Sequence, residues 1–428
     1  MSTTRRRLAA TTVAVMTGAT LMASASAPPA VAAEPVLTDF AMTANGWSTL
    51  LTGGDLPVRS GRTGFAIVGC TRFAFKSNQN NTAAVTFPAE GGEVFVGATT
   101  TNAFTDKNDA TVSSNALNDV ARVIIGDKSQ QALEIEGIKT RVRAFHDRSG
   151  YHRSAVVRVA DVTRYVNGVP TDVLTVPSNT DLDGEQVEVP GVATVTFGIK
   201  SGSATSRSAR AQALALRIDF AVTDTVLRVG QASARIDGGA VAGIMGGSVW
   251  GSRLTGLDGV ANSGRTALQV LPCVGTNGKF RVNQVAEVSI PDTVRLDTVT
   301  SKVKGDQDRS AASAKGVSTI TRAGFGSRDL VITGIEAVGE VVRRSDGSYV
   351  RSSRGTTLGS IVFQGEKRRI PQPGETLTIP GVARITPSLV DRTSVGIRVI
   401  AVRVELLQGS EVQSTLDLGN VKLGIRRG

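Results

Sequence analysis

Two segments of the chain open alike and end on a cysteine: residues 60–70 read SGRTGFAIVGC, and residues 263–273 read SGRTALQVLPC. The same frame extends upstream, where Trp47 aligns with Trp250. Over these 24 ungapped positions, 10 residues are identical. The pairs Trp47/Trp250 and Cys70/Cys273 include every tryptophan and cysteine of the 428-residue sequence. A repeat of this kind predicts two domains of one fold.

The repeat continues toward the C-terminus with small shifts of offset. LEIEGI at 133–138 matches LVITGI at 330–335, and GEQVEVPGVATVT at 184–196 matches GETLTIPGVARIT at 374–386. Unequal loops between equivalent strands would produce such shifts. The short turn DGG at 237–239 then separates a first copy, residues 34–238, from a second, residues 239–428.

Apolar residues alternate with polar ones within each copy, as they do in a strand with one buried face. The clearest runs are Leu214, Leu216, Ile218 and Phe220 in copy one and Ile400, Val402, Val404 and Leu406 in copy two. No helical periodicity competes with this pattern. We therefore predict an all-β protein with two similar tandem β-domains, each sandwich-like. A β-solenoid, or one continuous sheet through both copies, is the alternative.

A glycine marks the point where this alternation slips by one residue. In LEIEGIKTRVRAF, the apolar positions change from odd to even at Gly137, and Gly334 holds the matching place in copy two. A glycine at such a slip is typical of a β-bulge, which adds one residue to a strand.

The N-terminus reads as an export signal: three arginines, an apolar stretch and then small residues. We predict that residues 1–33 are a signal peptide, leaving the Sec and twin-arginine routes open. Its removal takes away three arginines and lowers the net charge from +11 to 11 − 3 = +8. No later segment is apolar enough to span a membrane. The mature chain is expected to be secreted and extracellular.

The order of motifs in both copies resembles the choice-of-anchor P family. The shared features are SGRT before a cysteine, the GI strand and PGVATVT before a closing strand. The resemblance implies an exported, cell-surface or extracellular protein of actinobacteria, and it brings no catalytic residues. The sequence stops at GIRRG without an LPxTG-like motif or hydrophobic tail. We therefore expect free secretion or noncovalent association with the cell wall.

The repeated cysteines leave two alternatives open. An exported protein meets oxidising conditions, and equivalent residues near a pseudo-twofold axis can touch. We hypothesise a disulfide between Cys70 and Cys273 that joins the copies. Two separately buried thiols are the other interpretation.

Few residues carry candidate chemistry. His146 and His152 lie in HDRSGYH, where they could face each other across a hairpin and, with Asp147, hold a metal or serve a hydrolase. DLDGE at 181–185 has oxygen ligands spaced as in a calcium loop. Copy two has no histidine and reads PQPGE at the second place, which favours plain turns. We predict no metal, no cofactor and no catalytic residues.

A basic stripe is the better candidate for binding. Lys139, Arg141 and Arg143 alternate and so share one strand face. Their equivalents in copy two are Glu336, Val338 and Glu340. The stripe would bind an anionic wall polymer, pair with those glutamates if the copies packed through that face, or lie solvated.

The tryptophans are expected to pack, because both copies place them at the same point of the fold. An aromatic content of 4% argues against a carbohydrate-binding module and against stacking on nucleic acid. The sequence thus favours a secreted, noncatalytic β protein that is a structural or interaction module of the envelope. Its partners would be anionic cell-wall polymers or other envelope proteins. The alternatives are a wall-polymer binding module using the stripe and a hydrolase using the His146/His152 hairpin.

Overall fold

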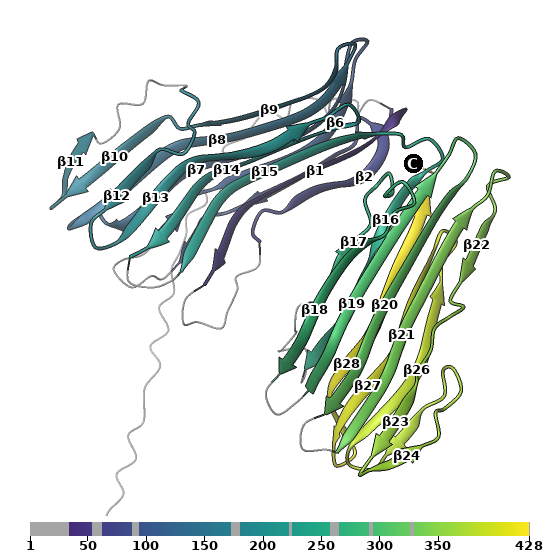
Figure 1. The fold of residues 1–428 in the computed structure, drawn as a ribbon. Coiled ribbons are helices and arrows are strands. Elements are labelled where there is room, and N and C mark those ends of the chain that lie inside the picture. The colour runs from purple at the N-terminus through teal and green to yellow at the C-terminus, as the bar shows by residue number, and fades with distance from the viewer. Residues whose placement is uncertain are drawn as a thin grey trace, which may run out of the picture. The chain divides into compact units, whose positions relative to one another are not determined.

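A computed structural model describes residues 34–53, 62–87, 94–172, 180–221, 225–256, 265–290, 294–325 and 329–427. The predicted signal peptide lies outside these residues. Within them the chain forms strands and turns with no helix, so none that could cross a membrane (Figure 1). The strands build several antiparallel sheets that pack in layers. The prediction of an all-β, sandwich-like fold is confirmed.

Copy one contains two sheets. The six-stranded sheet runs, in spatial order, through β12 (Gln186–Val189), β13 (Ala193–Ala204), β14 (Ser208–Phe220), β15 (Val226–Gly238), β1 (Val36–Thr52) and β2 (Ala66–Ala74). The nine-stranded sheet has the path β11 (Val169–Asp172), β10 (Asp161–Val166), β8 (Gln131–Asp147), β7 (Val112–Asp127), β5 (Val94–Val96) and β4 (Val85–Phe87). Off this path lie β3 (Ser77–Thr82), β6 (Thr99–Lys107) and β9 (Gly150–Arg158).

Copy two repeats the plan. Its six-stranded sheet runs through β17 (Gln269–Val270), β16 (Ile244–Gly256), β28 (Glu411–Arg426), β27 (Gly396–Gln408), β26 (Ala383–Arg392) and β25 (Leu377–Ile379). Its seven-stranded sheet runs through β18 (Arg281–Ile290), β19 (Val294–Gln307), β20 (Ala312–Phe325), β21 (Leu330–Arg343), β23 (Ser360–Phe363) and β24 (Glu366–Arg368), with β22 (Tyr349–Ser352) beside β21.

Each copy has its own hydrophobic core between its two sheets. In copy one, β14 and β15 pack on β7 and β8; in copy two, β28 packs on β20 and β21. The cores are built mainly from Val, Ile, Leu and Ala, as the low aromatic content requires. Among the described residues no ladder pairs a strand of one copy with a strand of the other. The alternative of one continuous sheet is not what this part of the chain forms.

The change of buried face at Gly137 has a different cause from the predicted β-bulge. Leu133 and Ile135 are buried before it and Ile138 after it. Yet Val120 pairs with Ile138, and Arg122 pairs with Glu136, so neither β7 nor β8 contains an extra residue. The bulge prediction is therefore wrong for Gly137. It is equally wrong for Gly334, because β20 and β21 also keep one register around it.

A crease shared by neighbouring strands replaces the bulge. Gly137 and Gly334 have φ values of 59° and 62°, a left-handed conformation that turns the following side chains to the other face. In β7 the buried face changes at the same level, between Val120 and Val123. Because paired strands switch together, the ladder stays in register while the sheet bends.

Candidate functional site

The arginine of each SGRT motif, Arg62 or Arg265, lies over a buried tryptophan. Trp47 and Trp250 are 2% and 4% exposed, respectively. The Arg62 guanidinium lies 5.9 Å from the ring centroid of Trp47, and that of Arg265 lies 4.4 Å from Trp250. Neither tryptophan belongs to the hydrophobic core between the two sheets of its copy, and the arginine of the motif lies over each ring in a cation–π contact.

Backbone hydrogen bonds hold the threonine of each motif, Thr63 or Thr266, beside β1 or β16. In copy one, Ser48 N donates to Thr63 O over 2.8 Å, and Thr63 N donates to Thr49 O over 3.1 Å. The equivalent bonds of copy two are Gly251 N to Thr266 O at 2.8 Å and Thr266 N to Ser252 O at 3.2 Å. The threonine of the motif is thus hydrogen-bonded to β1 or β16, and the arginine before it lies over the tryptophan of the same strand. We call this arrangement the Trp–Arg clasp.

The two cysteines form a disulfide between the copies. Cys70 lies in β2 and Cys273 in the turn that follows β17, with their Cα atoms 5.8 Å apart. Around the bridge, Ala41, Ala240 and Ile244 form a small hydrophobic cluster. Of the two alternatives that the sequence left open, the structure has the disulfide.

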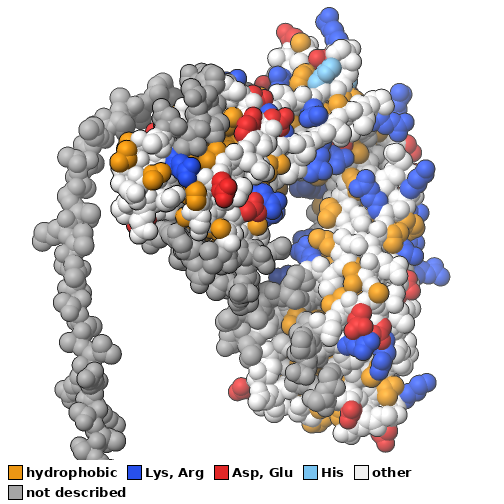
Figure 2. Space-filling view, turned by 60° about the vertical axis from the view of Figure 1, so that its left-hand side comes forward, with side chains coloured by type: hydrophobic (Ala, Val, Ile, Leu, Met, Phe, Trp, Pro, Cys, Tyr) orange, Lys and Arg blue, Asp and Glu red, His pale blue; other side chains and the backbone are white. Residues whose placement is uncertain are grey.

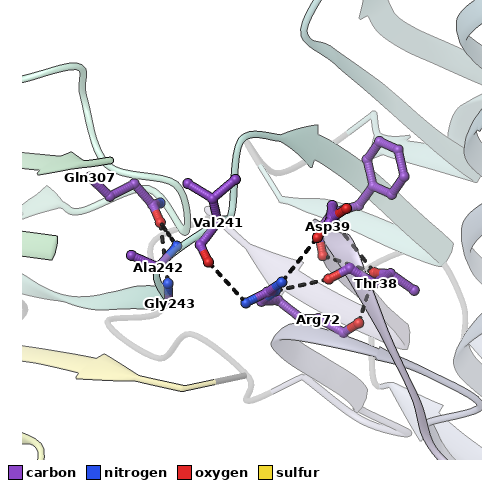
Figure 3. Close-up of polar contacts among 8 residues, drawn as sticks. Thr38, Asp39, Arg72, Val241, Ala242, Gly243 and Gln307 are labelled. Atoms are coloured by element: carbon purple, nitrogen blue, oxygen red, sulfur yellow. Dashed lines mark hydrogen bonds and ion pairs between the residues drawn. The ribbon is translucent and has the colours of Figure 1, made fainter. Parts of the chain in front are cut away.

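Arg72 binds the short linker that follows β15 from the side of copy one (Figure 3). Its Nε donates to Thr38 O over 2.8 Å, and its Nη2 lies 3.2 Å from Asp39 Oδ1. Its Nη1 donates to the carbonyl oxygen of Val241 over 3.3 Å. The Arg72 side chain is almost fully buried, so its guanidinium group, through these three contacts, orders the linker next to the disulfide.

Two side chains of copy two bind the same linker. Gln307 Oε1 accepts from Ala242 N and Gly243 N over 3.1 and 3.3 Å, as Figure 3 shows. Arg343 Nη1 donates to Ala242 O over 2.6 Å. Sequence reasoning missed both residues and Arg72, because their partners are backbone atoms that leave no motif.

The hairpin histidines do not face each other. His146 pairs with Tyr151 in the β8–β9 ladder, and Phe145 pairs with His152, so the two imidazoles lie on opposite faces. His146 packs against Phe40 and Tyr151, with ring centroids 4.7 and 4.5 Å apart. The expectation that the two histidines could share a metal or a reaction is therefore wrong in its geometry.

His152 instead joins a polar cluster in the turn. Its Nε2 lies 2.8 Å from Ser149 Oγ and 3.1 Å from Asp147 Oδ1. In a catalytic triad the serine and the carboxylate contact opposite ring nitrogens, whereas here they contact the same one. Ser149 also donates to Asp147 through its hydroxyl and its backbone N–H, and these bonds lower the pKa of Asp147. The cluster is a hydrogen-bonded turn.

The carboxylates of DLDGE serve separate structural contacts. Asp181 accepts from Val157 N over 2.9 Å and pairs with Lys200 Nζ over 2.9 Å. Glu185 accepts from the backbone N–H of Asp183 over 2.6 Å. Over the described ranges no group of three His, Cys, Asp or Glu residues is arranged to hold a metal ion.

The basic stripe lies on the outer face of the nine-stranded sheet. Lys139 stands beside Arg158 of β9 and Asp119 of β7 in the ladders. Arg143 donates to Thr111 Oγ1 over 3.2 Å and stacks over Phe145, whereas the described residues offer no ion-pair partner to Lys139 or Arg141. In the view of Figure 2, Lys and Arg side chains are scattered over the surface, with Asp and Glu among them.

The matching face of copy two does not pair with the stripe. Glu340 lies 3.9 Å from Lys315 of its own sheet, and Glu336 forms a backbone bridge with Thr357. Val338 is buried. Among the described residues, no ion pair links Lys139 or Arg143 to these glutamates, so the packing hypothesised for the two faces does not occur there.

Known families and proteins add nothing to this geometry, because no protein-family model and no curated protein sequence matches the chain. The resemblance to the choice-of-anchor P family rests on the repeated motifs alone. Function must therefore be argued from the disulfide, the linker and the basic stripe.

Proposed function

We propose that this chain is an exported, noncatalytic double β-sandwich that is a structural or interaction module of the cell envelope or the extracellular space. The Cys70–Cys273 disulfide carries the proposal. Structural disulfides persist in oxidising compartments and are rare in the cytosol. A covalent bridge, together with a linker bound from both sides, suits a module that must keep its two halves together outside the cell.

The test is the state of the native protein in its own cells. The expected result is a protein in the medium or wall fraction whose first residue lies near position 34 and which offers no alkylatable thiol until it is reduced. Intact mass under nonreducing conditions measures both. A cytoplasmic protein with two alkylatable thiols would contradict the proposal.

A second candidate is binding of anionic wall polymers, favoured by the basic stripe. Lys139 and Arg141 are exposed on a sheet face beside Arg158, and Asp119 is the acidic neighbour of Lys139 in the paired strand. A row of cations on one face attracts a polyanion over about a Debye length, roughly 8 Å at physiological salt.

Purified walls test this second function. The K139Q/R141Q/R143Q variant is expected to lose most wall binding, and raising the salt concentration should weaken binding of the wild type. The matched control is K302Q/R392Q/K422Q, which removes three exposed cations from copy two. Equal binding by the stripe variant and the control would eliminate the stripe as the binding face.

A further inference from the structure

A cavity lies beside the linker that joins the copies. Its volume is about 570 Å³, within the range of small-molecule sites. Its walls come from the end of β15, from residues 206–208, from Val241 of the linker and from residues 272–281 after the disulfide. We call this space the linker cavity.

The charge of the linker cavity is unbalanced. Its wall includes Arg207, Arg235, Lys279 and Arg281, and its only carboxylate is that of Asp237. That carboxylate is already bound by Arg235, with Nε to Oδ2 at 2.6 Å and Nη2 to Oδ1 at 2.7 Å. None of the other three cations takes part in an ion pair of the described residues. The wall therefore presents three positive charges without an anion.

The remaining wall groups suit a sugar. Phe280 lines the cavity and is 44% exposed, with Lys304 Nζ 5.0 Å from its ring centroid, so the exposed part of the ring is available for stacking. Asn277 and Ser206 add an amide and a hydroxyl group to the wall, whereas the Thr276 hydroxyl already donates to Lys279 O and accepts from Gly305 N. Burial and the nearby Asp237 raise the pKa of Tyr151, which keeps its hydroxyl protonated and able to donate a hydrogen bond.

Both walls are held by backbone bonds. Gly238 N donates to Arg207 O over 2.9 Å, which fixes the turn that carries Arg207 against β15. On the other side, Thr276 N donates to Gly305 O over 2.7 Å, and Gln307 Nε2 donates to Val274 O over 3.2 Å. A site that is ordered before binding loses less entropy when the ligand enters.

We propose that the linker cavity binds a short acidic oligosaccharide. A sugar ring lies against Phe280, and its carboxylates are bound by Arg207, Lys279 and Arg281. The site is separate from the basic stripe, which lies on β8. It also goes beyond a structural role, because the junction of the two copies would itself be a binding site.

Isothermal titration calorimetry of the disulfide-bonded chain with a galacturonic-acid oligosaccharide tests the proposal. The expected result is saturable binding at one site, weakened at least tenfold by K279Q/R281Q. The methyl-esterified oligosaccharide keeps the sugar rings but lacks the charges, and it should bind at least tenfold more weakly. The controls K302Q/K422Q and K139Q/R141Q should bind as the wild type does.

Three results would overturn the proposal: no saturable binding, unchanged affinity in K279Q/R281Q, or the same loss in K302Q/K422Q. Binding of inorganic tripolyphosphate, which is charged but has no sugar ring, is compared with binding of the oligosaccharide in the F280A variant. The comparison distinguishes recognition of charge from recognition of the sugar ring. F280A should weaken the oligosaccharide several-fold and leave tripolyphosphate unchanged. Equal weakening of both probes would overturn the assignment to a sugar. Thermal unfolding of each variant shows whether a loss of binding reflects a loss of folding.

Discussion

The two copies share one scaffold but differ at the surfaces that could bind a partner. The Trp–Arg clasp, the crease glycines Gly137 and Gly334 and the two-sheet plan occur in both copies. The face of β8 is basic, whereas its equivalent on β21 carries Glu336, a buried Val338 and Glu340. The features that the fold requires occur in both copies. Features that occur in only one copy, such as the basic face of β8, are candidates for function.

The cysteines are repeated in the sequence but form a feature that occurs once. They hold equivalent sequence positions, yet Cys70 lies in a strand and Cys273 in a turn. Their pairing uses a duplicated position to make a single bridge. The same contrast applies to the linker cavity, whose walls come from nonequivalent segments of the two copies.

The largest expected effect comes from removing the bridge. The C70S/C273S variant frees a loop of 203 residues in the unfolded chain, for which chain entropy predicts a loss of about 5 kcal/mol in the free energy of unfolding. Urea unfolding followed by circular dichroism measures it. A loss below about 1 kcal/mol would mean that the copies unfold independently, since the bridge then constrains neither.

Removing the tryptophan from either clasp comes next. Trp47→Ala and Trp250→Ala should each cost about 3 to 5 kcal/mol, because each ring is almost wholly buried. Each variant keeps one tryptophan, whose fluorescence reports on the other copy while circular dichroism reports on the whole chain. Similar costs are expected. A cost below 1 kcal/mol in one copy would show that its clasp is not structural.

Substitution of the crease glycines should reveal a difference in stability between the two copies. An alanine at Gly137 would place its Cβ 2.6 Å from the Cβ of Ala160, whereas at Gly334 the nearest atom is Gly359 Cα at 3.2 Å. Both substitutions carry the left-handed penalty, so we expect about 3 kcal/mol for Gly137→Ala and about 1 to 2 kcal/mol for Gly334→Ala.

Adding Ala160→Gly to Gly137→Ala removes the crowding atom but keeps the backbone strain. The double variant should therefore recover to the stability of Gly334→Ala in the same urea titration. If Ala160→Gly restores nothing, the cost at Gly137 is conformational alone, and the two creases are energetically alike.

The fold was readable from the sequence because a sheet with one buried face leaves its period of two in the residues. The prediction failed for the His146/His152 hairpin, where the result depends on the strand register to within one residue. His146 and His152 would face each other only if the turn spanned Arg148–Gly150. The turn is Arg148–Ser149, so His146 pairs with Tyr151 instead. A shift of one residue moves a side chain to the other face of the sheet.

The crease was misread for a related reason. A single strand shows that its buried face changes, but whether an extra residue is inserted depends on the neighbouring strand. The linker contacts of Arg72 and Gln307 were beyond reach as well, because backbone carbonyls and amides carry no residue identity. Long-range partners of this kind need the packed structure.

The smallest expected effect concerns the arginines of SGRT. Arg265 lies closer to its tryptophan than Arg62 does, 4.4 Å against 5.9 Å from guanidinium to ring centroid. Because exposed cation–π contacts contribute about 0.5 to 1 kcal/mol, Arg265→Ala should cost up to about 1 kcal/mol and Arg62→Ala less. Chemical unfolding of each variant beside its Arg→Lys counterpart separates charge from the planar stacking of the guanidinium. If Arg62→Ala proves the more costly, the distance between guanidinium and ring does not determine what the arginine contributes to the clasp.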